Sequence, residues 1–394
     1  VGSRCRTKRA RCAGGTGVNT RARWAEVAWT RLGAFARPGL VASMLMVLPI
    51  AACTTVPPSA PGVEATPGAV RPEPALMAMP QPTIEPWVFG GAQGSIVRLP
   101  GLSIHVVVRD RWLADTLPRF AWQAMQHYRT ALGALPEPRR PIDTYIFGKR
   151  SQWEQYTREA LRDSAELYLG MGRGGYTIEG RAVLYDIGPV DTLFIVAHEG
   201  WHQYTQSTFV EPLPPWMEEG LATFMEGHRM RNERTTIEFL PWRNLERFSE
   251  LRSVVREGRM VSLGQLVSGT PQSFLGDGRD SLLSYYAQVW ALMHFLNEGE
   301  GGRYRAAFRQ LVDDAANGRM ADRMGLVRRS RLMPGRLVLN QYFKVDEREL
   351  DRQYQAFVKQ IVASGAGDAI WAGENPIEFA ARKAAAKSAS PPKP

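Results

Sequence analysis

Hydrophobic and polar positions divide the central part of the chain into a strand-rich region and a helical region. Residues 103–109 and 141–147 are short runs rich in Val, Ile, Tyr and Phe, which favour extended backbone. Helical periodicity over 112–132 and 149–162 predicts two helices, and 181–187 is a third predicted strand. Beyond it the pattern is helical almost without interruption. We therefore expect an α+β domain, a small mixed β-sheet followed by a mainly helical half, with the functional site at the seam.

The segments on either side of this region have a different composition. Residues 54–86 contain nine prolines among Ala, Gly, Thr and Ser, which is typical of a semi-rigid spacer. The end of the chain, 380–394, is built from Ala, Lys, Ser and Pro and predicts a disordered tail. These observations predict four segments: a leader at 1–52, a Pro-rich linker at 53–86, a folded domain at 87–371 and a flexible tail at 372–394.

The net charge of +10 is concentrated in the leader. Residues 1–52 hold nine Lys or Arg against the single acid Glu26, whereas the other 342 residues hold 40 basic and 38 acidic side chains. The folded part has no basic motif and no basic–aromatic stripe, so we do not expect it to bind nucleic acid. The three cysteines are Cys5, Cys12 and Cys53, which excludes a disulfide framework or a thiolate metal site beyond Cys53.

The leader carries an apolar run of 12 residues, Gly39–Ile50, preceded by Arg31 and Arg37. A membrane-spanning helix needs about 20 apolar residues, so this run favours a secretory signal. The ending Ile50-Ala51-Ala52-Cys53 resembles a bacterial lipobox. That resemblance implies an acyl chain on Cys53 and a lipid-anchored, periplasm-facing protein of the bacterial cell envelope, with the membrane as a partner. The alternative is a buried core helix that ends at an incidental cysteine.

A predicted helix from Pro189 to about Ser207 carries the clearest chemical motif. Its early turns are apolar all round, and directly after them come His198-Glu199-Gly200-Trp201-His202. Residues i and i+4 share one helical face, so the two imidazoles can point at one ion while Glu199 sits beside it. This HExxH pattern is typical of zinc hydrolases. The alternative is a pair of hydrogen-bonded histidines in a buried helix.

A catalytic zinc ion takes a third protein ligand and leaves a fourth position to water. Pro215 begins a second short predicted helix, which contains Glu218 and Glu219 and is ended by Gly227. The order HExxH, short loop, Trp-x-x-Glu-Gly-x-Ala resembles the gluzincin metallopeptidases, which include thermolysin and the aminopeptidase N type. The resemblance implies Glu219 as the third ligand. Glu218 is the weaker candidate, because it points roughly 100° away around the helix. As an alternative, both are first-turn acids favoured by the helix dipole.

A third segment, Ser284–Leu296 with Gly299 as its stop, is a predicted helix. The string Tyr-Ala-Gln-x-Trp-Ala-Leu-x-His-Phe-Leu, which begins at Tyr286, is similar to part of the peptidase MA-like domains, bacterial proteins that share the gluzincin core. The resemblance as a whole runs from about residue 174 to residue 296. It implies that Tyr286 stabilises the oxyanion, with Tyr285 as the alternative.

Two further histidines lie near these motifs. We expect His294 to be a hydrogen-bonded core residue, because it falls eight positions beyond Tyr286, and His228 to lie at the surface.

The gluzincin resemblance implies a mechanism. Neutral His198 and His202 and ionised Glu219 hold Zn²⁺, whose charge lowers the pKa of a bound water. Glu199 accepts the water proton and delivers it to the leaving amine. The chain departs from the family at Thr223, one turn beyond the third ligand, where thermolysin-like enzymes have an Asp; we expect Thr223 to orient a ligand histidine.

The substrate implied by the resemblance is a peptide or protein. The predicted strand 181–187 would offer its edge to an extended peptide. The chain lacks the Gly-x-Met-x-Asn segment of the aminopeptidase N type, so an endopeptidase is favoured. The competing hypothesis is a catalytically silent envelope lipoprotein that uses the zincin core as a binding scaffold. Displacement of Glu199 from the metal, or a closed site with no groove, would favour that hypothesis.

Overall fold

One mixed sheet forms the first half of the fold, seen in a computed structural model that describes residues 79–170, 174–232, 236–326 and 333–389. Its strands are β1 (Thr83–Phe89), β2 (Ala92–Leu99), β3 (Leu102–Val107), β4 (Ile142–Phe147), β5 (Gly175–Ile178) and β6 (Arg181–Tyr185). They lie in the order β1-β2-β3-β4-β6-β5. β3, β4 and β6 are parallel, whereas β1, β2 and β3 form an antiparallel meander and β5 runs antiparallel to β6. The edges of this sheet are therefore β1 and β5.

Both faces of the sheet are covered by helices. Side chains alternate between the faces along each strand. Ile104, Ile146 and Leu184 belong to the main core together with α1 (Arg111–Thr130) and α4 (Pro189–Thr208). On the same three strands, Val107, Phe147 and Val183 face the opposite side of the sheet and pack with Trp153 of α2 (Arg150–Leu161). A 3₁₀ turn, η1 (Arg162–Ser164), and α3 (Glu166–Leu169) lead from α2 to β5.

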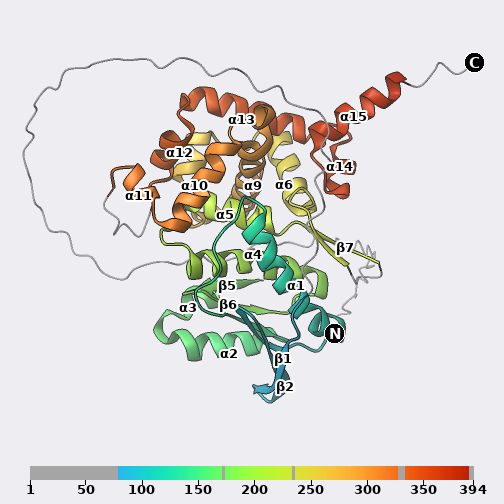
Figure 1. Ribbon diagram of the computed structural model, residues 1–394, viewed down its shortest axis with the longest axis vertical. Coiled ribbons are helices and arrows are strands. Elements are labelled where there is room, and N and C mark those ends of the chain that lie inside the picture. The colour runs from blue at the N-terminus through green and yellow to red at the C-terminus, as the bar shows by residue number, and fades with distance from the viewer. Residues whose placement is uncertain (1–78, 171–173, 233–235, 327–332, 390–394) are drawn as a thin grey trace, which may run out of the picture.

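The second half is helical and lies beyond α4 as seen from the sheet (Figure 1). The remaining elements in chain order are α5 (Pro215–Met225), β7 (His228–Arg231), β8 (Thr236–Phe239), α6 (Leu245–Arg256), α7 (Leu263–Ser268), α8 (Pro271–Gly276), α9 (Arg279–Gly302), α10 (Arg305–Asn317), α11 (Met320–Arg323), α12 (Gly335–Phe343), α13 (Glu347–Ile361), α14 (Ala366–Ala372) and α15 (Pro376–Ala389). The backbone leaves helical geometry at Gly299, where the predicted stop falls. β7 and β8 pair as an antiparallel hairpin.

The α+β prediction is confirmed, with a six-stranded mixed sheet followed by a mainly helical region. Two segment boundaries differ from the expected ones. β1 begins at Thr83, inside the stretch expected to be a spacer, and α15 is helical where we expected a flexible tail. The leader, Cys53 and the apolar run before it lie outside the described residues. Among the residues that are described, no helix combines the length and the apolar character needed to cross a membrane.

The sheet topology corrects the expectation about the peptide-binding edge. β6 corresponds to the predicted strand 181–187, but it pairs with β4 on one side and with β5 on the other. Its backbone groups are therefore already used in the sheet. β5 takes the edge position next to α4.

Candidate metal centre

Helix α4 carries the HExxH motif and is fixed against the sheet by side-chain hydrogen bonds. Gln203 accepts from Thr144 Oγ1 at 2.9 Å and donates through Nε2 to Asp143 O at 2.7 Å, which ties the helix to β4. On the other side, Tyr128 of α1 donates to Ala197 O at 2.7 Å. These hydrogen bonds fix the position of α4, and therefore of its two histidines, relative to the sheet and to α1.

Close helix packing in this region requires glycine at two positions. A Cβ at Gly200 would lie 2.7 Å from the hydroxyl of Tyr128, so α1 and α4 can approach only because residue 200 has no side chain. A Cβ at Gly220 would lie 2.8 Å from Met293 Cε and 3.0 Å from Val289 O on α9. The glycines inside the two motifs therefore serve helix packing, and they bring α1, α4, α5 and α9 together around one point.

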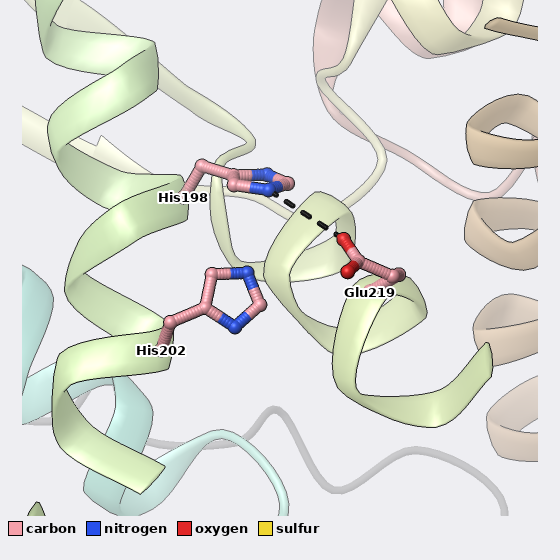
Figure 2. Close-up of side chains that lie close together, drawn as sticks. All are labelled: His198, His202 and Glu219. Carbon is pink, nitrogen blue, oxygen red and sulfur yellow. Dashed lines mark ion pairs between the residues drawn. The ribbon is translucent and has the colours of Figure 1, made fainter. Parts of the chain in front are cut away.

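At this point His198 and His202 of α4 face Glu219 of α5, as Figure 2 shows. Nε2 of His198 lies 3.8 Å from Glu219 Oε2, and one ligand atom from each of the three residues lies within 4.8 Å of the others. Ligand atoms around tetrahedral Zn²⁺, with bonds of about 2.0–2.1 Å, are separated by about 3.4 Å. The three side chains could thus hold a metal ion after a small inward movement. The sequence placed these residues on two helices, and the structure brings all three together.

Each histidine has a carboxylate on its Nδ1 side. Glu218 Oε1 lies 2.7 Å from His202 Nδ1 and also accepts from Thr205 Oγ1 at 2.6 Å. Glu226 Oε2 lies 3.5 Å from His198 Nδ1. Such carboxylates orient the imidazole ring and assign Nε2 to the metal. Glu218, which the sequence left as the weaker ligand candidate, thus contacts His202 through Nδ1 and leaves Nε2 of that ring available to a metal ion.

The role expected for Thr223 is wrong. Its hydroxyl donates to Glu219 O at 3.1 Å and Gly220 O at 2.8 Å, within its own helix. A buried hydroxyl in a helix readily satisfies itself on the preceding turn, and this one does so. Glu226, one turn further along, provides the group that contacts His198.

Glu199 lies beside the three ligand candidates and is hydrogen-bonded through one carboxylate oxygen only. Oε2 accepts from Thr177 Oγ1 of β5 at 2.6 Å. Oε1 is buried and has no hydrogen-bond partner among the described residues. The edge strand of the sheet therefore holds one oxygen of this carboxylate and leaves the other available for chemistry.

Burial controls the protonation of these groups. It lowers the pKa of His198 and, together with His198, lowers that of His202 well below the ordinary range. Both imidazoles are therefore neutral, which is the form that binds metal. Burial also raises the pKa of Glu199 to about 8, and burial with the charges of Glu218 and Glu199 raises that of Glu219 far above its ordinary range.

The charge balance of the centre favours a bound cation. Four carboxyl groups gather here, those of Glu199, Glu218, Glu219 and Glu226, against one buried guanidinium, that of Arg247. Oε2 of Glu219 is buried and lacks a hydrogen-bond partner within the described part of the chain. A buried carboxylate without a counter-charge is strongly unfavourable. Without a cation, burial keeps Glu199 and Glu219 protonated near neutral pH. A divalent cation at the three ligand candidates would favour their ionised forms, so the donor set and the electrostatics both fit a metal ion.

Both tyrosines of α9 lie next to the site and are buried. The ring of Tyr286 meets the His198 ring edge to face, with 6.2 Å between centroids. The hydroxyl of Tyr285 has no hydrogen-bond partner among the described residues, and burial, with the charge of Glu219, raises its pKa well above the ordinary range. Tyr286 thus contacts His198, whereas Tyr285 has the buried hydroxyl without a partner among the described residues.

The two other histidines considered in the sequence analysis, His294 and His228, do not belong to the three-residue group among the described residues. His294 is buried, as expected, and stacks on Trp242 with 3.6 Å between ring centroids. The expected hydrogen bond is missing among the described residues, where Nδ1 lies 3.7 Å from Glu298 Oε1. His228 was expected at the surface, but it is buried at the start of β7, where Nδ1 lies 2.8 Å from Glu226 O. The sequence rule failed because the residue after a helix-ending glycine was assumed to enter solvent. Here it enters a second hairpin that packs on α1.

The part of the chain that contains the candidate metal ligands is similar to a known protein family. Residues 192–333 match the model of a family described as a protein of unknown function, DUF1570. No curated protein and no solved structure matches the chain. The matched stretch contains His198, His202, Glu219 and both tyrosines. The buried His-His-Glu group thus lies within the stretch that is similar to this family of unknown function.

Proposed function

We propose that this protein is a zinc-dependent peptidase, most simply an endopeptidase. The observation that carries the proposal is the convergence of His198, His202 and Glu219 within 4.8 Å, with the carboxylate of Glu199 on the next position of the same helix. Two imidazoles and one carboxylate are a ligand set of catalytic zinc sites, in which the remaining position stays open. A purely structural zinc site closes that position with a fourth protein ligand.

Zn²⁺ held by these three residues would supply Lewis-acid activation of water and polarisation of the peptide carbonyl. A bound cation would favour the ionised form of Glu199. In that form Glu199 acts as the general base through Oε1, because Thr177 holds its other oxygen in place. After attack, the same carboxyl group gives its proton to the leaving amine. A tyrosine hydroxyl of α9 stabilises the charge that develops on the carbonyl oxygen.

Matched Phe variants distinguish the roles of Tyr286 and Tyr285. Loss of an oxyanion donor lowers kcat by about 10²- to 10³-fold and leaves metal binding in place. We expect this loss in Tyr286→Phe. The same loss in Tyr285→Phe with near-normal turnover in Tyr286→Phe would transfer the role to Tyr285.

The substrate in this proposal is an extended peptide or unfolded protein in the cell envelope. β5 is the strand edge nearest to Glu199, so main-chain pairing with a peptide would take place there. The envelope location rests on the signal and lipobox residues that end at Cys53, which would anchor the domain to the membrane behind the Pro-rich linker.

A second candidate function is supported by one observation. The side chains of His198, Glu199, His202 and Glu219 are at most 2% exposed. A site this closed admits a peptide only after the surrounding helices move, and a binding scaffold with a silent metal centre needs no such movement. The alternative is therefore an envelope lipoprotein that keeps the zincin core for binding.

The experiment that separates the two functions is cleavage of an unfolded protein such as casein by the zinc-loaded protein. The peptidase proposal predicts cleavage by the wild type and loss of cleavage in Glu199→Gln. Stoichiometric zinc without cleavage across a substrate screen would favour the scaffold.

A further inference from the structure

A buried ion pair lies behind His198 and takes no part in the ligand set. Arg247 of α6 is only 4% exposed, and its Nε lies 3.1 Å from Glu226 Oε1. Asn244 Nδ2 donates to the same oxygen at 2.8 Å. The other oxygen of Glu226, Oε2, faces His198 Nδ1 at 3.5 Å. One carboxylate thus joins an arginine of α6 to a metal-ligand candidate of α4.

The guanidinium of Arg247 has a second contact in the site. It lies over the ring of Tyr286, 5.2 Å from the centroid, and that ring in turn meets His198 edge to face. Arg247, Glu226, His198 and Tyr286 therefore form a closed cycle of contacts. The four residues come from α6, the end of α5, α4 and α9.

The start of α6 is built to hold Arg247 in this position. Asn244 is the N-cap of the helix, and its Oδ1 accepts from Arg247 N at 3.2 Å. The Nδ2 group of the same side chain donates to Thr223 O at 3.0 Å as well as to Glu226. One amide side chain thus fixes the register of α6 relative to the end of α5, and with it the arginine relative to the carboxylate.

A contribution to stability does not by itself explain why Arg247 and Glu226 are buried as an ion pair. Arg247 is the only Arg or Lys in the described part of the chain that is buried. Burying an ion pair costs desolvation that well-packed apolar side chains avoid, so a buried pair is weak evidence of a stabilising role. A guanidinium is, however, planar and rigid, and can hold a carboxylate while it stacks on an aromatic ring.

We propose, on the basis of the proposed function, that Arg247 is a positioning residue of the metal centre. Through Glu226 it fixes the rotation of the His198 ring so that Nε2 faces the ion, and through its stacking contact it fixes the Tyr286 ring. The arginine touches neither the ion nor the substrate. It sets the geometry of one ligand and of the neighbouring tyrosine together.

The test compares three variants by zinc affinity in competition with a chelator, by the visible absorption of the Co²⁺-loaded protein, and by kcat and KM separately. Arg247→Met removes the charge and leaves Glu226 alone. Arg247→Lys keeps the charge without the planar fork. The double variant Glu226→Leu/Arg247→Met removes both charges, so that no unpaired ion stays in the core.

We expect Arg247→Met to weaken zinc binding about 10- to 100-fold. The double variant recovers thermal stability but not zinc affinity or the Co²⁺ spectrum, and Arg247→Lys shows an intermediate loss with kcat reduced more than KM is raised. Asp314→Asn is the matched control, because Asp314 of α10 is fully buried and paired with Arg319, which precedes α11, and with Arg323 of α11, outside the contacts of the metal centre. It should lose stability and keep wild-type zinc affinity.

Wild-type zinc affinity, Co²⁺ spectrum and kcat in the folded double variant would overturn the proposal. If neither Met-containing variant folds, Arg247→Lys decides: wild-type values in all three measurements overturn the proposal, and a shifted spectrum with lowered kcat supports it. If the wild type binds zinc and cleaves casein, and the Arg247 variants do so equally well, the role of Arg247 is refuted but the proposed function is not. Failure of the wild type to bind zinc would refute the proposed function as well.

Discussion

Replacing Glu199 by Gln should make the metal-free protein more stable than the metal-free wild type. Glu199 is fully buried, and burial raises its pKa from the ordinary 4.5 to about 8. A carboxyl group with a raised pKa in the folded state costs stability wherever the unfolded chain would ionise it. Gln keeps an oxygen that can accept from Thr177 and carries no ionisable group. The substitution therefore removes the cost and retains the hydrogen bond.

The size of the effect follows from the two pKa values. The cost is absent below pH 4.5, grows as the pH rises, and reaches its full value above pH 8. With 1.36 kcal/mol for each pKa unit, it amounts to about 1 kcal/mol at pH 5 and about 3 kcal/mol at pH 7. A bound divalent cation favours the ionised carboxylate, so the advantage of Gln should shrink or reverse when zinc is present.

Urea unfolding with a chelator present, at pH 5 and at pH 7, measures this difference directly. Glu159→Gln serves as the control, because Glu159 is exposed and its replacement should change the free energy of unfolding by less than about 0.5 kcal/mol. Equal stability of Glu199→Gln and wild type at pH 7, or a difference that does not grow between the two pH values, would refute the account of a desolvated carboxylate.

Three further predictions concern neighbouring residues. Glu218→Gln should weaken zinc binding about 10-fold through loss of the charged contact to the ligand histidine, whereas Thr223→Val should leave zinc affinity within about twofold, as measured by chelator competition. Gly220→Ala should cost about 1–3 kcal/mol in urea unfolding because its Cβ meets α9, whereas Gly276→Ala, with no atom near its Cβ, should be nearly neutral. Burial lowers the pKa of His228 to about 4, so up to about 3 kcal/mol of stability should be lost as the pH falls from 6.5 to 4, and His228→Phe should flatten that decline.

The sequence predicted much of the fold because local signals there agree with tertiary structure. The helix that carries His198 and His202 was predicted at Pro189 to about Ser207 and is observed at Pro189–Thr208. Pro at the first helical position and the i, i+4 spacing of the histidines are local features that packing did not override. The pairing of Glu219 with this helix came from family resemblance, since periodicity alone gives no contact between two helices.

The sequence did not identify Thr177, Glu226 and Arg247 as part of the site, because their roles depend on contacts between distant segments. Thr177 and Glu199 are 22 positions apart, and β5, which carries Thr177, is only four residues long with no alternating pattern to mark it. Glu226 follows the last turn of α5 and resembles any surface acid in the sequence. Its partner Arg247 lies on a helix whose polar residues fit an exposed face. Only the packing of α6 against the end of α5 shows that both are buried.

The proposed function requires that α4 and α5 build a catalytic zinc site. It is tested most directly by measuring bound zinc and casein cleavage on the same preparations of wild type, Glu199→Gln and His202→Ala. We expect one zinc ion per chain with cleavage in the wild type, one zinc ion without cleavage in Glu199→Gln, and neither in His202→Ala. A wild type that takes up no zinc when the ion is supplied, or a Glu199→Gln variant that cleaves as fast as the wild type, would contradict it.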